Sequence, residues 1–248
     1  MLNAIRGFLF YVAFSIILIP FAITLWMLKP FKRDWRFAYA RQWANLMLWL
    51  GRVICGMRWE EKGMENLPDS SQPVVVLAKH QSAWETFWMF ARLPNYISYV
   101  YKKELHWVPV FGWALASMEM MAINRAEGRH AFVQFMRQGA KFMDDGWWIV
   151  LFPEGTRTTP GCEPNYKTGG ARFAVSKGVP VVPIALNAGE LWPRNSIAKK
   201  PGLITVSVGP MIETKGKTVD EVQQAMINWI EGEMAVISPE IYGQKKAR

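Results

Sequence analysis

The stretch "VVVLAKHQSAWETFW", residues 74–88, joins an apolar run to a helical pattern and places polar residues at the junction. The branched apolar residues before Lys79 predict a strand that is buried on both faces. Ser82 and Glu85 have the spacing of a capping box, which predicts a helix start. His80 therefore lies where a strand ends and a helix begins. In α/β proteins, ligand crevices lie at such strand ends.

The rest of the chain continues this alternation and sets the fold class. The expected strands are residues 73–79, 96–101, 119–123, 147–152, 179–186 and 203–209, and the expected helices are residues 83–92, 127–144, 168–177 and 218–236, with Gly146 and Gly178 as helix stops. These elements predict an α/β domain with a mixed, mostly buried central sheet flanked by helices. Two prolines in residues 179–186 suggest an edge strand or a bulge beside a cavity, the alternative being ordinary core packing.

The N-terminal segment has the composition of a membrane anchor. Residues 7–28 contain no charged residue and are long enough, as a helix, to cross a hydrocarbon core. Pro20 indicates either a kink in a spanning helix or a helix that enters one leaflet. Residues 37–56 are amphipathic and rich in Trp, which fits an interfacial helix and a core helix equally well. We therefore expect residues 1–58 to form an anchoring helical pair and residues 59–248 to form the α/β domain.

Composition narrows the class of partner. The chain has 29 Lys and Arg against 20 Asp and Glu, a formal net charge of +9, which favours anionic partners. Thirteen Trp and 14 Phe favour a membrane interface over nucleic acid, because the basic residues form no long tract. Basic residues after residue 28 predict that the domain lies on the cytoplasmic side. Two Cys give no disulfide framework, and the three His lack metal-ligand spacing, so neither a metal nor a cofactor is expected.

Two further groups of polar residues follow expected strands. "FPEGTR", residues 152–157, turns so that Arg157 points away from the strand end, where its guanidinium is suited to a phosphate; a simple pair with Glu154 is the alternative. Lys102 and Lys103 directly follow another strand and either bind an anion or form a solvated turn. The apolar "VPVFGW", residues 108–113, comes next and suits a lipid chain or a membrane contact.

His80 and Glu85 can be interpreted in two ways. Glu85 is either the capping partner of Ser82 or the carboxylate that orients the imidazole of His80 as a general base. The two roles are compatible. The stretches "KHQSAWE", "YKKELHWVPVFGW", "FPEGTR" and "VPVVPIAL", in this order, resemble the four blocks of the glycerolipid acyltransferase family that includes bacterial 1-acylglycerol-3-phosphate acyltransferases. The resemblance covers roughly residues 60–210, with Glu85 where the family usually has Asp.

The resemblance implies a function and a site. It implies acyl transfer from acyl-CoA or acyl carrier protein to the hydroxyl of a lyso-phospholipid at a bacterial-type inner membrane, with His80 as base oriented by Glu85. It implies a phosphate site at Arg157 with Lys102 or Lys103, shaped by Glu154 and Gly155. The acyl-chain contacts expected from it are Val108, Pro109, Phe111, Gly112, Trp113, Val181 and Pro183. Alternatives are another acceptor (a lyso-ornithine lipid, lysophosphatidylglycerol or glycerol 3-phosphate) and, outside enzymes, a protein that only binds anionic lipid.

Overall fold

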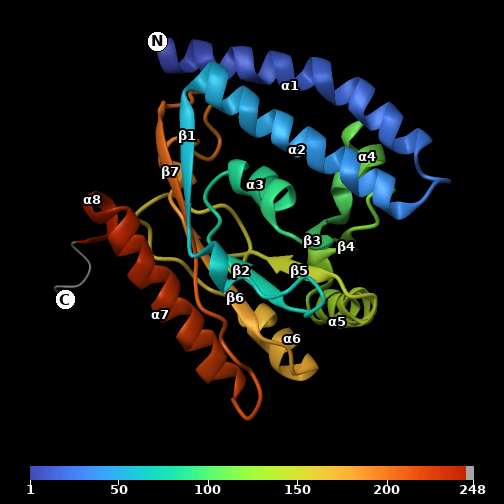
Figure 1. Cartoon of the computed structure of the whole chain (residues 1–248), viewed down its shortest axis with the longest axis vertical. Coiled ribbons are helices and arrows are strands. Elements are labelled where there is room, and N and C mark those ends of the chain that lie inside the picture. The colour runs from blue at the N-terminus through green and yellow to red at the C-terminus, as the bar shows by residue number, and fades with distance from the viewer. Residues whose placement is uncertain (244–248) are drawn as a thin grey trace.

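The computed structural model describes residues 1–243 and shows a seven-stranded mixed sheet between helices (Figure 1). The sheet order is β1-β7-β6-β2-β5-β3-β4. Among the described strands β6 and β7 pair antiparallel, while the other neighbouring pairs run parallel. The strands are β1 (Met57–Lys62), β2 (Val75–Ala78), β3 (Ile97–Lys102), β4 (Met121–Ile123), β5 (Trp148–Leu151), β6 (Val181–Leu186) and β7 (Gly202–Val208). The expected α/β class with a mixed sheet is confirmed.

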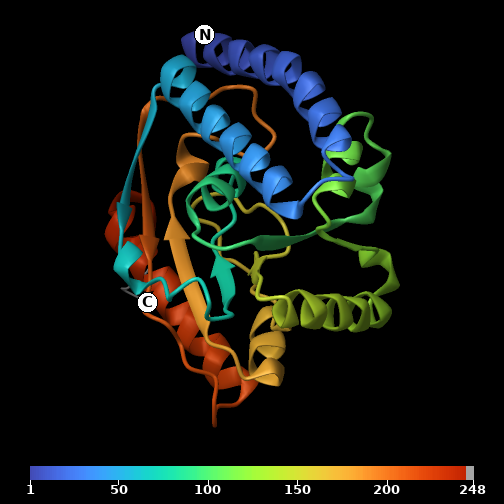
Figure 2. The ribbon, with the colours of Figure 1, turned by 45° about the vertical axis from the view of Figure 1, so that its right-hand side comes forward.

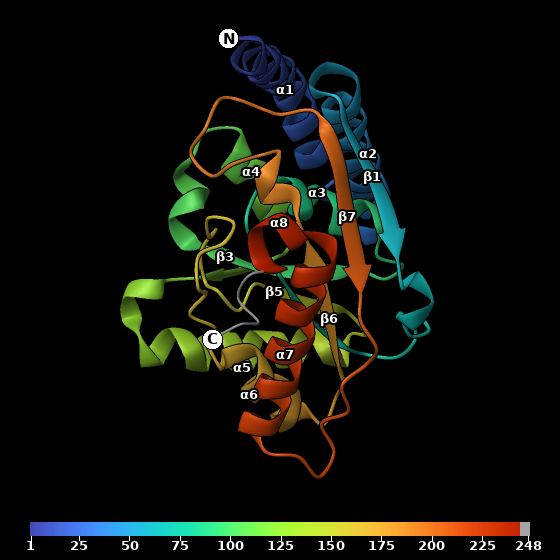
Figure 3. The same cartoon turned by 90° about the vertical axis from the view of Figure 1, so that its left-hand side faces the viewer.

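Helices cover both faces of the sheet, and the alternation of side chains along each strand explains why. Val76 and Ala78 of β2 face a core shared with the N-terminal helices, whereas Val75 and Leu77 face a second core. Figure 3 shows the last two helices in front of the sheet, over that second core. The helices are α1 (Leu2–Met27), α2 (Arg33–Cys55), α3 (Trp84–Arg92), α4 (Phe111–Ser117), α5 (Arg129–Asp144), α6 (Gly169–Lys177), α7 (Val219–Ile237) and α8 (Pro239–Tyr242), with short 3₁₀ turns at Met64–Asn66, Lys103–Trp107, Arg125–Glu127 and Ala188–Glu190.

The six expected strands and four expected helices are present, with ends that agree to within two residues. Gly146 and Gly178 follow α5 and α6 with positive φ, as expected of helix stops. The strand β1 was not expected, because its sequence "MRWEEK" is polar; it forms the sheet edge and pairs with β7. The helix α4 was also missed.

The expectation that residues 179–186 form an edge or a bulge is wrong. β6 lies inside the sheet, between β7 and β2. Its Pro183 accepts a hydrogen bond at its carbonyl from Gly209 N, so the side that lacks an N–H faces β7. The paired residues of β6 and β7 begin at Ile184, so the missing N–H of Pro183 falls at the end of this ladder and not within it.

α1 and α2 form an antiparallel pair that lies across the domain on the side of α3 (Figures 1 and 2). Gly7 permits a close approach, because a Cβ there would lie 1.7 Å from the carbonyl oxygen of Ile197. On α2, the ring of Phe37 stacks on Phe90 of α3 at 5.5 Å between centroids. The pair thus shares a core with the α/β domain, and the division at residue 58 stays a prediction.

Candidate active site

The candidate site lies at the carboxyl ends of β2 and β5, which are neighbours in the sheet. His80 comes two residues after β2, and Arg157 comes six residues after β5. The imidazole of His80 stacks on the ring of Phe152, with centroids 3.8 Å apart. The ring of Tyr99, in the middle of β3, stacks in turn on Phe152, with centroids 6.2 Å apart. Aromatic side chains of β3 and of the turn after β5 therefore help to hold the plane of the imidazole.

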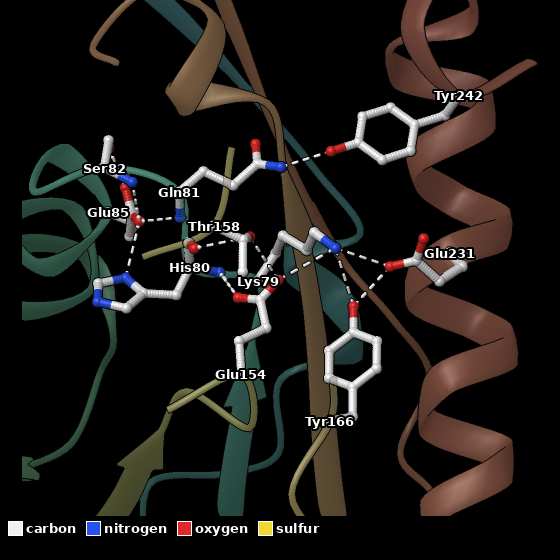
Figure 4. Close-up of polar contacts among 10 residues, drawn as sticks. All are labelled: Lys79, His80, Gln81, Ser82, Glu85, Glu154, Thr158, Tyr166, Glu231 and Tyr242. Atoms are coloured by element: carbon white, nitrogen blue, oxygen red, sulfur yellow. Dashed lines mark hydrogen bonds and ion pairs between the residues drawn. The ribbon is translucent and has the colours of Figure 1, made fainter. Parts of the chain in front are cut away.

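The carboxylate of Glu85 orients the imidazole of His80. Nδ1 of His80 lies 2.9 Å from Oε1 of Glu85, whose side chain is fully buried in the first turn of α3 (Figure 4). The backbone N–H groups of Gln81 and Ser82 donate to the same oxygen at 2.8 and 2.6 Å, and the Ser82 hydroxyl donates to Oε2. Glu85 thus accepts hydrogen bonds from the N–H groups of the turn and also contacts the imidazole of His80. Its position fits both the capping role and the role of orienting the imidazole. A hydrogen on Nδ1 leaves Nε2 as the acceptor.

His80 lies on the wall of a cavity of about 1200 Å³. The cavity runs from the strand ends to the N-terminal helices, and most of its wall is apolar. The basic residues Lys102 and Arg157 lie on the wall as well. Large apolar side chains on this wall include Phe14, Leu18, Phe21, Trp43, Phe87 and Phe111. A base, four cationic side chains (Lys167 and Arg172 besides the two named) and a long apolar space in one cavity suit a substrate with an anionic head and a hydrocarbon chain.

The expected phosphate residues separate into two groups. Arg157, Lys102 and Gly155 lie on the cavity wall with His80, and Lys103 is not part of that wall. Glu154 lies outside the described cavity wall, within the turn that it was expected to shape. Its carboxylate is buried, with Oε1 3.1 Å from Nζ of Lys79. Burial raises the pKa of Glu154, and the charge of Lys79 opposes that rise.

Of the seven expected acyl-chain residues, the structure brings Phe111 to the cavity wall. Trp113 and Val108 are about half exposed on the outside, while Pro109 and Gly112 belong to the turn and helix behind Phe111. Val181 and Pro183 lie buried within β6, away from the described wall. The apolar wall comes instead from α1, α2 and α3 and from residues 99–135, which include α4 and the first half of α5. The aromatic side chains on one face of the first two helices were the sequence signal that was missed.

Sequence reasoning also missed a buried cation next to His80. Lys79 is fully buried, and its Nζ lies 2.7 Å from Oε1 of Glu231 on α7 and 3.0 Å from the hydroxyl of Tyr166. Burial alone would lower the pKa of Lys79, but the charges of Glu154 and Glu231 outweigh it and raise the pKa. A lysine that ends an otherwise apolar strand was the available signal, because such a cation requires anionic partners in the core.

Comparison with known proteins agrees with this geometry. A family model described as Acyltransferase matches residues 58–187. The 1-acyl-sn-glycerol-3-phosphate acyltransferase of Pseudomonas aeruginosa is 39% identical over 96% of this chain and 93% of its own length. The human 1-acyl-sn-glycerol-3-phosphate acyltransferase alpha is 30% identical over 72% of this chain and 63% of its own.

The fold has a counterpart of known structure. The crystal structure of the 1-acyl-sn-glycerophosphate acyltransferase of Thermotoga maritima superposes with a TM-score of 0.76, at 19% identity, over 99% of this chain and 97% of that one. Fold and family model together define an acyltransferase. More narrowly, the chain belongs to the family of 1-acyl-sn-glycerol-3-phosphate acyltransferases.

Proposed function

We propose that the protein transfers a fatty acyl group from an acyl thioester to the free hydroxyl of 1-acylglycerol 3-phosphate and so produces phosphatidic acid, with His80 and Glu85 as the general-base pair. The observation that carries this proposal is the 2.9 Å contact between Nδ1 of His80 and Oε1 of Glu85 on the wall of a cavity that also holds Arg157. His80 takes the proton of the acceptor hydroxyl at Nε2, which points away from Glu85 (Figure 4).

The reaction then needs no acyl-enzyme. The hydroxyl oxygen bonds to the thioester carbonyl carbon as its proton moves to Nε2 of His80. The tetrahedral species collapses, the C–S bond breaks, and the thiolate leaves as a thiol with the proton from the imidazolium. Glu85 stabilises the imidazolium during this interval, because its carboxylate is fixed beside Nδ1 by the turn.

Arg157 and Lys102 bind the acceptor's phosphate. Both lie on the wall that carries His80, and both supply N–H donors that suit a phosphate. Binding the phosphate at a fixed place also fixes the glycerol hydroxyl relative to Nε2. The binding energy of the head group thereby contributes to the rate of the chemical step. The hydrocarbon chain occupies the apolar part of the cavity, between α1, α2 and α3.

The protein works at a membrane surface. α1 is long and apolar enough to span a bilayer, by length and composition. It lies flat on the domain, and its outward face exposes Phe8, Ile16 and Trp26. That face enters the bilayer, so that the cavity beneath α1 receives the lyso-lipid directly from the membrane. The basic residues after α1 support a position of the domain at the cytoplasmic face of a bacterial-type inner membrane, where acyl-CoA or acyl carrier protein would be the donor.

The test is thiol release from acyl thioester by the purified full chain, with lysophosphatidic acid, lysophosphatidylglycerol, a lyso-ornithine lipid and glycerol 3-phosphate as acceptors. We expect release with lysophosphatidic acid, and a loss of at least about 100-fold in His80→Ala. His130→Ala is the matched control, because His130 is exposed on α5 and lies outside the described cavity wall. Release that no acceptor stimulates, or a His80→Ala protein as fast as wild type, would refute the proposal.

A further inference from the structure

Lys79 has a position that the proposed chemistry does not use. It directly follows β2 and precedes His80, and its ammonium group is directed to the side of the sheet opposite the imidazole (Figure 4). The side chain is fully buried, and three oxygen atoms surround Nζ: those of Glu154, Glu231 and Tyr166, at 3.1, 2.7 and 3.0 Å. A buried cation with this number of partners is costly to assemble and stable only when complete.

The partners of Lys79 lead to the backbone of His80. Oε2 of Glu154 accepts the N–H of His80 at 2.5 Å, while Oε1 of the same carboxylate contacts Lys79. Arg157 lies three residues after Glu154 in the same turn. The next residue, Thr158, donates its N–H to the carbonyl oxygen of His80 at 2.8 Å. Both backbone groups of His80 are thus held by residues 154–158, which also carry Arg157.

The ion pair therefore joins the two turns that carry the proposed base and the proposed phosphate ligand. β2 and β5 are neighbours in the sheet, but their pairing covers residues 75–77 and 149–151 and does not reach either turn. Beyond the last sheet pair, the Lys79–Glu154 contact and the two bonds to the His80 backbone connect the turns. The Lys79–Glu154 contact is therefore one of the links that hold His80 to the turn that carries Arg157, together with the stack of the imidazole on Phe152.

α7 completes the arrangement from the far side. Glu231 accepts from both Lys79 and Tyr166, and the hydroxyl of Tyr166 donates to it at 2.6 Å. Tyr166 belongs to the loop between β5 and α6. A third element therefore sets the position of Nζ, and through it the position of Glu154.

We propose that Lys79 is a positioning residue that, together with Glu154 and Glu231, sets the separation between His80 and Arg157 and so the distance of the bound acceptor hydroxyl from its base. The inference rests on the proposed function of His80 and Arg157. Lys79 does not touch substrate in this account. It acts through the backbone of His80 and through the turn at residues 154–158.

The test compares kcat and KM of the full chain with lysophosphatidic acid. Lys79→Met lowers kcat by at least about tenfold, because the base and the bound hydroxyl lose alignment. KM changes by no more than about threefold, because Arg157 still binds the phosphate. Glu231→Gln, which keeps an oxygen acceptor for Lys79, stays near wild type, whereas Glu231→Leu loses kcat. Glu231 is partly exposed, so its variants fold even where Lys79→Met does not.

A double variant separates positioning from burial of a lone charge. Lys79→Met leaves Glu154 as an uncompensated buried carboxylate, whereas Lys79→Met/Glu154→Gln removes that buried charge, leaves only the partly exposed carboxylate of Glu231, and keeps an acceptor for the His80 N–H. The double variant regains part of the kcat lost by Lys79→Met. Ile230→Ala is the matched control: Ile230 is a fully buried neighbour of Glu231 on α7, and its truncation lowers Tm while kcat stays near wild type.

Hydrogen exchange gives a readout that does not depend on activity. The amides of residues 80–82 and 154–158 exchange faster in Lys79→Met than in wild type, but not in Ile230→Ala. If the wild-type protein is inactive with lysophosphatidic acid, the proposed function is refuted. Hydrogen exchange of these amides in Lys79→Met still tests whether Lys79 holds the two turns together. The inference is overturned if folded Lys79→Met keeps kcat and exchange at wild-type values, or if Ile230→Ala reproduces its losses.

Discussion

Nδ1 of His80 lies 2.9 Å from Oε1 of Glu85, a carboxylate one methylene longer than the Asp that the family usually has at this position. The extra length is used by the turn, because the same carboxylate also accepts from the N–H groups of Gln81 and Ser82. Both residues of the pair come from one strand-to-helix junction, so local sequence largely fixes their geometry.

Because of this geometry, we expect the active site to require the length of the Glu85 side chain. Glu85→Asp withdraws the oxygens by one bond length, and we expect kcat to fall about tenfold or more through misalignment. Glu85→Gln removes the charge that stabilises the imidazolium, so kcat should fall further, by about 100-fold or more. Steady-state kcat at a temperature where circular dichroism shows folded protein is the measurement. A Glu85→Asp enzyme as fast as wild type would contradict the account of the turn.

Lys102 and Lys103 provide a matched pair for the phosphate site. Lys102 lies on the cavity wall and Lys103 does not. Removing a charge-assisted hydrogen bond costs about 2 kcal/mol, so Lys102→Ala should raise KM for lysophosphatidic acid on the order of 30-fold. Lys103→Ala should leave KM near wild type. Equal effects of the two substitutions, measured at saturating acyl donor, would remove Lys102 from the site.

The apolar cavity predicts an effect on acyl-chain length. Leu18 of α1 lies on the cavity wall, whereas Ile19 is about half exposed on the outer face. Leu18→Trp fills part of the cavity, so activity should shift toward shorter acyl chains. Ile19→Trp should keep the wild-type profile. The ratio of kcat/KM across a series of acyl thioesters and lyso-lipids tests this, and an unchanged profile in Leu18→Trp would exclude this part of the cavity as the chain site.

The outer face of α1 predicts membrane binding. Phe8 and Ile16 expose about two thirds of their surface there. Inserting each side chain into the interface contributes about 1.5–3 kcal/mol to the free energy of membrane binding. Phe8→Glu and Ile16→Glu should therefore release protein from vesicles in a sedimentation assay. Val133→Glu and Val236→Glu are controls, since these side chains are equally exposed on α5 and α7. Release by all four substitutions to the same extent would show that α1 is not the contact.

Lys199 predicts a pH dependence of stability. Its Nζ is buried against backbone oxygens and the rings of Tyr11 and Trp192, and burial lowers its pKa to about 8. Between that pKa and the unfolded value of 10.5, the unfolded chain binds more protons than the folded one. The free energy of unfolding therefore rises with pH through this window.

Comparison with Lys199→Met isolates this contribution. The wild-type protein should gain stability relative to the variant as pH rises from about 7 to about 10. Denaturant unfolding at several pH values measures the difference. A difference that stays constant, or falls with pH, would show that Lys199 keeps its charge in the folded protein.

The polar residues at the strand ends were well predicted from the sequence, whereas the residues that line the cavity were not. His80, Arg157 and Lys102 were found because each lies at or shortly after the carboxyl end of an apolar strand, and parallel strands bring these ends to one edge of a sheet. Val181 and Pro183 were expected at the acyl chain from the family resemblance, and the prolines of this strand also suggested an edge or a bulge beside a cavity. β6 lies inside the sheet instead, where the missing N–H of Pro183 falls at the end of a ladder.

The sequence by itself determined most of the elements and brought His80 and Glu85 to one strand-to-helix junction, because hydrophobic periodicity, turn residues and short spacings act within a few residues. The class of reaction followed from the resemblance of its motifs to a known family. Only the tertiary structure decided which residues surround the substrate and which hold the site together. The apolar wall at Phe14 and Trp43 comes from helices that local pattern assigned to an anchor. Lys79 meets Glu231, 152 residues later in the chain, because a buried charge takes its partner wherever the packed core brings one within reach.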